Sequence, residues 1–187
     1  MIIARANHRV TYPARFQLVA AMNPCRCGMA GEPGYRCARG ARCQSDYQAR
    51  ISGPLLDRID LRIDVPAVSA SDLIRPARAE PSAAVAERVA RARTIQRERF
   101  DRLGLVTTLN AHCPTALVEV IAAPDAGGLA LLRDASEKMG FSARAYHRVL
   151  KVARTLADLD AAEMVGRIHL AEAISYRIMA ERMAQAA

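Results

Sequence analysis

The chain has 187 residues, of which 51% are hydrophobic and only 4% aromatic, and its formal net charge is +8. This length permits one large domain or two small ones, and a core built from aliphatic side chains favours helix packing over a β-sandwich. The chain has no apolar run of the roughly 18 residues that a membrane span needs and no secretory signal. We therefore expect a cytoplasmic protein without a membrane partner.

The positive charge is carried almost entirely by arginine, because Lys138 and Lys151 are the only lysines among 27 basic residues. Arginine presents a planar fork to phosphate and carboxylate groups, which favours nucleotide or nucleic-acid partners. A genome of high GC content would also replace lysine by arginine. Both explanations of the arginine excess stay open.

The first part of the chain has the patterns of β-structure. Short β-prone runs at 2–5 and 9–12 predict a hairpin. The apolar run at 15–22 predicts a buried strand that ends at Asn23. An alternating run at 61–65 predicts a further strand before Pro66.

Two short helices are expected between these strands. One covers 44–51 with Ser45 as its N-cap, and the other begins at Ser52-Gly53-Pro54. Leu55 and Leu56 would anchor the second helix by burial. A segment of this size cannot cover both faces of a sheet, so it is expected to be part of something larger.

From residue 82 onward the periodicity is helical. Proline, alanine and serine mark 67–81 as a linker. Four helices are expected at about 82–103, 129–139, 142–156 and 168–183, with Ser142 as the N-cap of the third. The fold class is therefore an α/β piece at 1–66 followed by an all-α domain at 82–187, mainly α overall.

Two motifs in the first part of the chain carry candidate chemistry. Asn23 ends the strand pattern RFQLVAAMNP, and a polar residue at a strand end can touch a ligand, although Asn-Pro there is more often a turn. Arg58 lies within the run ISGPLLDRIDL, at the end of the expected short helix, where a surface salt bridge is the simpler explanation. We expect Asp57 and Asp60 to hold the Arg58 guanidinium in place.

In this order, AAMNP and ISGPLLDRIDL resemble the second half of the ATPase module in magnesium-chelatase-like AAA+ ATPases of the ComM/YifB type. The resemblance implies that Asn23 is sensor 1 and that Arg58 is an arginine finger acting on a neighbouring protomer of a ring, expected to be a hexamer. Arg50, eight residues earlier, is the second candidate. The residues at 1–66 would then be the C-terminal part of an AAA+ core.

The helical part carries the same resemblance. FSARAYHRVLKVARTLADL and HLAEAISYR are similar to the last helices of this family. The resemblance places Arg144 at the sensor 2 position, where an arginine reaches the γ-phosphate. We interpret Arg148, Lys151 and Arg154 as a basic, solvated helix face. The region at 82–187 would be the helical lid.

The opening segment resembles the β-hairpin that precedes sensor 1 and faces the pore in related DNA-translocating rings. Arg5, His8 and Arg9 would lie near its tip and contact phosphates of DNA. A solvated turn explains the same residues. The resemblance to the ComM type implies that the parent is a DNA-remodelling motor that drives branch migration of transforming DNA.

The motif G-x-x-x-x-G-K-[ST] is absent from the chain, as is an acidic Walker B strand end. We expect a C-terminal fragment whose parent uses ATP and Mg²⁺, and we expect the chain alone to be inactive as an ATPase.

Four cysteines lie in one loop of about twenty residues, namely Cys25, Cys27, Cys37 and Cys43. Four thiolates can hold a tetrahedral Zn²⁺, and reduced free thiols are the alternative. Cys113 is expected in the core or at a helix start. The competing function is a small zinc-bearing basic module that binds nucleic acid without enzymatic activity. The ordered set Asn23, Arg58 and Arg144 favours the ATPase.

Overall fold

The computed structural model describes residues 2–5, 8–13, 16–28, 37, 39–40, 42–66, 68, 73–74 and 79–185, with only the backbone given for 178–185. Most of the expected linker at 67–81 lies outside these residues. By internal contacts the chain divides into two units, Met1–Tyr47 and Gln48–Ala187. We describe each unit by itself.

The first unit opens with the expected hairpin. Strands β1 (Ile2–Arg5) and β2 (His8–Thr11) pair antiparallel, with Ile2 opposite Thr11 and Arg5 opposite His8. Every described residue of both strands is exposed. The prediction from the β-prone runs is confirmed to within one residue.

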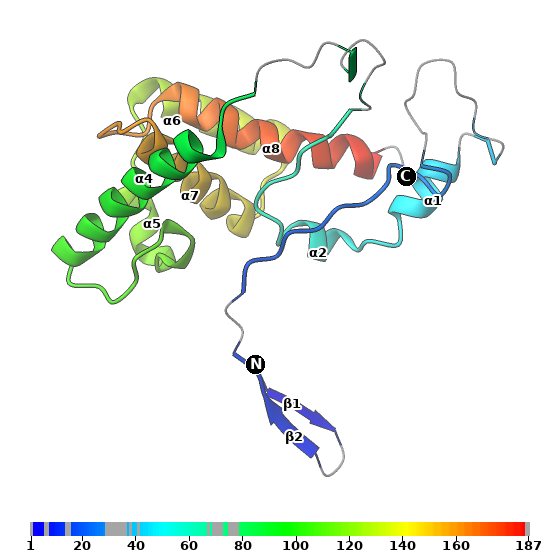
Figure 1. The fold of residues 1–187 in the computed structure, drawn as a ribbon, viewed down its shortest axis with the longest axis horizontal. Helices are drawn as coiled ribbons and strands as arrows, with labels where there is room; N and C mark the ends of the chain where they lie inside the picture. The colour runs from blue at the N-terminus through cyan, green and yellow to red at the C-terminus, as the bar shows by residue number, and fades with distance from the viewer. Residues whose placement is uncertain are drawn as a thin grey trace. The chain divides into compact units, whose positions relative to one another are not determined.

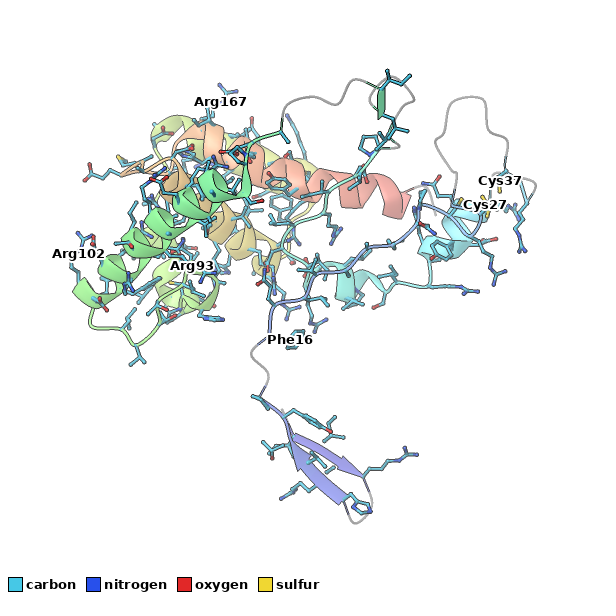
Figure 2. The ribbon with its side chains drawn as sticks, in the orientation of Figure 1. Phe16, Cys27, Cys37, Arg93, Arg102 and Arg167 are labelled. Atoms are coloured by element: carbon cyan, nitrogen blue, oxygen red, sulfur yellow. The ribbon has the colours of Figure 1, made fainter. Side chains whose placement is uncertain are left out.

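The strand predicted at 15–22 is wrong for the part that the structure describes. Residues 16–23 are exposed and carry no strand pairing, and Phe16 is 78% exposed (Figure 2). A strand is stabilised by the backbone ladder to a neighbour. Among the described residues β1 and β2 pair with each other alone, so this segment lacks a partner strand.

Helix α1 (Arg42–Gln48) closes the first unit and begins two residues earlier than expected. Ser45 is therefore inside the helix, and its hydroxyl donates to the Arg42 carbonyl at 3.0 Å. Its assignment as N-cap is wrong, because a cap must precede the first helical residue.

The second unit opens with helix α2 (Gly53–Leu56), which begins as expected after Ser52. The strand expected at 61–65 does not form. Those residues are extended and mostly exposed, without a strand partner among the described residues. Neither core strand inferred from the apolar patterns forms in the part of the chain that the structure describes, and assignment of 1–66 to an AAA+ core stays a prediction.

The remainder is a helical assembly, coloured green to red in Figure 1. Its elements are α4 (Ser82–Arg102), the 3₁₀ turn η1 (Asn110–His112), α5 (Thr115–Ile121), α6 (Ala126–Met139), α7 (Ala143–Leu159) and α8 (Arg167–Gln185). The four expected helices are confirmed as α4, α6, α7 and α8. Ser142 caps α7 by accepting from the Ala145 amide at 3.1 Å. The sequence reading missed η1 and α5.

Helix α7 lies at the centre of this assembly and packs against α4, α5 and α8. It buries one apolar stripe that includes Val149, Leu150, Ala153 and Ala157. Phe100 from α4 is fully buried in the same cluster. The mainly α fold is therefore confirmed, with its core built by helices that follow residue 81.

A buried polar network crosses this core. The Asp158 carboxylate, 1% exposed, accepts hydrogen bonds from Arg99, Asn110 and Arg154. Arg154 also donates to the carbonyl groups of Glu163 and Ala162 at 2.8 and 2.6 Å. Burial lowers the pKa of the Arg154 guanidinium, and the neighbouring Asp158 opposes that shift. The assignment of Arg154 to a solvated face is wrong.

In the described part of the chain, every helix is too short or too polar to cross a lipid bilayer.

Candidate functional site

Arg58 lies one turn beyond a capped helix. The Ser52 hydroxyl accepts from the Leu55 amide at 3.4 Å and so caps α2. The amide of Arg58 donates to the Leu55 carbonyl at 2.9 Å, which continues the turn to the arginine itself. The Arg58 side chain is exposed, and its Nη1 donates to the Pro54 carbonyl at 2.7 Å. An exposed guanidinium on an ordered turn can meet an anion from outside.

Burial of leucines does not anchor this turn. Leu55 is 48% exposed and Leu56 is only half-buried, so the expected apolar anchor is wrong. A four-residue helix offers too little surface to bury both side chains. The segment is held through its backbone and through Asp57.

Arg177 of α8 provides that hold. Its Nη2 donates to the Asp57 carboxylate at 2.7 Å and to the Asp57 carbonyl at 3.3 Å. Its Nη1 donates to the Ile59 carbonyl at 3.5 Å. The two carbonyl groups flank Arg58, and the Arg177 side chain is 9% exposed. One buried guanidinium therefore contacts the backbone on both sides of the arginine.

The second carboxylate oxygen of Asp57 faces the start of α7. The Ser142 hydroxyl lies 3.4 Å from Asp57 Oδ2, and Arg144 Nη1 lies 3.9 Å from the same oxygen. Arg144 is in the first turn of α7 and its side chain is 55% exposed. The structure thus brings Arg144 to the residue that precedes Arg58, although the two belong to distant parts of the sequence.

Asp60 pairs with Arg148, one turn further along α7. The expectation that Asp57 and Asp60 hold the Arg58 guanidinium is therefore wrong, since both carboxylates pair with arginines of α7 or α8. Arg148 is half-buried by this contact, and Lys151 donates to the Ala111 carbonyl at 3.0 Å. The basic residues of α7 serve to connect segments.

The remaining candidates for nucleotide contact are exposed. Arg50 lies between α1 and α2 in the second unit, together with Arg58 and Arg144. Asn23 belongs to the first unit, where its amide lies near Gly28: a Cβ there would be 3.8 Å from Asn23 Nδ2. Gly28 has a positive φ of 81°, which glycine adopts without strain.

The basic hairpin residues are displayed to solvent. Arg5 and His8 are directly paired across the two strands, and Arg9 is opposite Ala4. All three side chains are exposed. Cross-strand pairing keeps these basic groups close together at one end of the hairpin.

The four loop cysteines gather as the sequence predicts. Cys25 and Cys27 have their Sγ atoms 2.8 Å apart, and Cys27 and Cys37 have theirs 3.4 Å apart (Figure 2). The Sγ atoms of Cys25, Cys27 and Cys43 lie within 4.8 Å of one another. Tetrahedral Zn–S bonds of about 2.3 Å would place the sulfurs about 3.8 Å apart, so the donor set fits zinc after small shifts.

Neighbouring thiols affect the protonation of Cys37. A backbone hydrogen bond from Arg39 lowers the pKa of the Cys37 thiol, but hydrogen bonds to Cys27 and Cys43 and partial desolvation outweigh it and raise the pKa to about 11. Metal binding would remove such protons. Cys113 is buried beside α5, in agreement with its predicted place in the core.

Two family profiles match the sequence. The profile described as magnesium chelatase, subunit ChlI, matches residues 1–73, and that of the ChlI C-terminal part matches residues 79–177. The chain belongs to the magnesium-chelatase-like family of the ComM/YifB type. The prediction from the sequence motifs is confirmed at this level.

Relatives in this family are similar over nearly the whole chain. The competence protein ComM of Haemophilus influenzae is 41% identical over 180 residues, which cover 96% of this chain and 34% of the relative. The uncharacterized YifB proteins of Salmonella typhimurium and Escherichia coli are each 38% identical over 94% of the chain and 33% of their own length. The chain thus spans about a third of these relatives.

The sequence analysis did not identify the contact that Arg177 makes. It matched the surrounding motif to the last helix of the family and gave this arginine no role. The motif HLAEAISYR contains this arginine, but its partner Asp57 is 120 residues away. The sequence carries no local signal for this contact, because Glu181 offers Arg177 an acidic neighbour one turn away along the helix.

Proposed function

We propose that this chain supplies the arginine finger and the sensor residues of a ring-forming ATPase of this family. Arg58 would act in trans on a nucleotide bound by a neighbouring protomer, whereas Arg144 and Asn23 would act on the protomer's own nucleotide. The observation that carries the proposal is the exposed Arg58 on an ordered turn, whose adjacent Asp57 is paired with the candidate sensor 2 residue.

The chemistry explains why arginine is needed at both places. Hydrolysis of ATP, with Mg²⁺ bridging its phosphates, spreads negative charge over the transferred phosphoryl oxygens. A planar guanidinium can donate two parallel hydrogen bonds to such oxygens. Arg58 is exposed, and among the described residues its guanidinium donates to the Pro54 carbonyl, which a phosphate oxygen could replace. Arg144 lies at a helix N-terminus, where the backbone also favours an anion.

Replacement of Arg58 is the direct test in a full-length protein that contains this sequence and a P-loop. Arg58→Ala should leave ATP binding nearly normal and reduce turnover by at least about a hundredfold. Arg58→Lys should not restore it, since an ammonium lacks the planar fork. Arg93→Ala, on the exposed face of α4 (Figure 2), is the matched control and should keep wild-type turnover.

A mixing experiment separates action in trans from action in cis. Subunits with Arg58→Ala should regain partial activity when mixed with subunits that are defective only in the P-loop, because each supplies what the other lacks. If Arg58→Ala turned over ATP at the wild-type rate, Arg50 would become the candidate. If co-assembled mixtures stayed inactive, the trans assignment would be wrong.

The parent is proposed to remodel DNA, as the name of the competence relative and the basic hairpin suggest. Arg5, His8 and Arg9 would contact phosphates, whose neutralisation releases counterions. Replacing Arg5 and Arg9 by alanine should weaken DNA binding for all sequences alike and reduce the slope of log K against log salt concentration by about two. An unchanged slope would exclude the hairpin as a DNA contact.

We further propose that Cys25, Cys27, Cys37 and Cys43 hold one Zn²⁺, whose role is to order the loop. The close Sγ atoms support this proposal. Elemental analysis of protein purified without added metal should find about one zinc per chain. A folded, metal-free sample with four titratable thiols would reject it. The alternative, a zinc-bearing module without enzymatic function, would also hold metal. In that case Arg58→Ala would leave the ATPase rate of the full-length protein unchanged.

A further inference from the structure

The segment that carries Arg58 is fixed from the far end of the chain. Its own short helix α2 has no buried residue, so it cannot hold Arg58 rigidly by packing. An arginine that acts on a bound phosphate must be placed to within a fraction of an ångström. Some other group must therefore supply the rigidity.

Arg177 has the geometry for this task. Three hydrogen bonds reach residues 57 and 59, which leaves Arg58 between two anchored peptide groups. The guanidinium is nearly buried, and hydrogen bonds to a charged donor are the strong ones in such a setting. Helix α8 itself packs against α6 and α7 through Leu170 and Ile174, so Arg177 projects from a rigid support.

We propose that Arg177 is a positioning residue for Arg58: it ties the turn that carries Arg58 to helix α8, so that movement of the helical assembly moves the trans-acting arginine with it. This inference rests on the function proposed above for Arg58. Arg177 itself touches no nucleotide.

Asp57 connects this support to Arg144. Its Oδ1 pairs with Arg177, and its Oδ2 faces both Arg144 and the cap residue Ser142. The ion pair of Arg148 with Asp60 adds a second tie between the segment and α7. Arg144, which would sense a protomer's own nucleotide, therefore lies against the carboxylate of the residue next to Arg58, which would act on the neighbour's nucleotide. The segment that carries Arg58 is tied to the same two helices, α7 and α8.

Hydrogen exchange on this chain tests the structural half of the proposal without any nucleotide. The amides of Asp57, Arg58 and Ile59 are hydrogen-bonded to carbonyl groups of residues 53, 55 and 56, so their exchange reports on the turn. Arg177→Lys should increase their exchange by about tenfold and leave α4 and α7 unchanged. Arg167→Lys, on the exposed start of α8 (Figure 2), is the matched control. It should leave exchange unchanged both at the three turn amides and in α4 and α7.

Asp57→Asn is a second variant that guards against a folding defect in Arg177→Lys. It keeps both backbone carbonyl groups that Arg177 binds and removes only the carboxylate charge. It should increase exchange at the same amides by a smaller factor. Unchanged exchange in both variants, with folding verified by circular dichroism, would overturn the inference whatever Arg58 does.

The functional half is measured in a full-length protein that contains this sequence and a P-loop. Arg177→Lys should reduce kcat by about tenfold to a hundredfold, while KM for ATP stays within about twofold. In the Arg58→Ala background the same change should have no further effect, because Arg177 acts through Arg58. Additive losses, or a wild-type kcat in Arg177→Lys, would overturn the positioning role. A wild-type rate in Arg58→Ala would overturn the proposed function and this inference with it, and the exchange data would then identify Arg177 as structural only.

Discussion

The two units of this chain use similar apolar side chains in opposite ways. In Gln48–Ala187, Phe100 and Leu150 are 0% and 1% exposed inside a core made by helices of that unit. In Met1–Tyr47, Phe16 and Val19 are 78% and 86% exposed. An apolar residue stabilises a fold only when other elements remove it from water. The comparison teaches that apolar content alone says little about where the stability of this chain resides.

The largest effect on stability is expected from truncating a side chain in the helical core. Phe100→Ala should lower the free energy of unfolding by about 3–5 kcal/mol, because it leaves a cavity among packed side chains. Phe16→Ala should leave it almost unchanged. Chemical denaturation monitored by far-UV circular dichroism measures both. Equal losses in the two variants would contradict the contrast between the units.

The next effect concerns the buried network. Asp158→Ala should lower the free energy of unfolding by about 3 kcal/mol, because Arg154 and Arg99 would lose the carboxylate that balances their buried charges. Replacing the exposed Asp101 on α4 by alanine provides the control and should have little effect. A small loss in Asp158→Ala would mean that water enters the network and replaces the carboxylate.

A smaller effect is expected where α6 approaches α8. A Cβ added at Gly128 would lie 2.8 Å from Leu170 Cδ1 and 3.2 Å from Pro124 Cβ. Gly128→Ala should therefore destabilise the second unit by about 1–3 kcal/mol. Gly127→Ala, whose Cβ would find ordinary contacts of 3.6 Å or more, is the neighbouring control. Both variants add one methyl group to the same helix. The difference between their thermal unfolding temperatures therefore measures the effect of the steric clash at Gly128.

The smallest effect on the helical unit is expected from the cysteine loop. Cys27→Ser should abolish zinc binding and disorder the loop. It should leave the unfolding of the helices after residue 81 within about 0.5 kcal/mol of wild type, because surface changes away from a core rarely exceed that. Metal analysis and hydrogen exchange of the helices measure the two outcomes. A large loss in helix stability would show that the units depend on each other.

The helices could be predicted because their signals are local. Ser142 caps α7 three residues from the amide that it binds, and Asp125 does the same for α6 at Gly128. The apolar stripe of α7 can be recognised from the spacing of apolar residues within a single short segment. The gathering of the four cysteines also followed from spacing in one loop. Helix α5 was missed because seven residues give too few turns for a clear period.

The sequence by itself thus determined the family, the hairpin, four helices and the list of candidate arginines and cysteines. The tertiary structure decided which arginines are exposed and which are buried. Arg58 and Arg144 lie at the surface, Arg154 lies inside the core, and Arg177 holds the turn next to Arg58. The physical reason is separation along the chain: a cap or a helical stripe is complete within a few residues, whereas an ion pair such as Arg177 with Asp57 joins residues 120 positions apart. The same reason applies to the absent strands, since an apolar run becomes a strand only where another segment offers it a hydrogen-bonded neighbour.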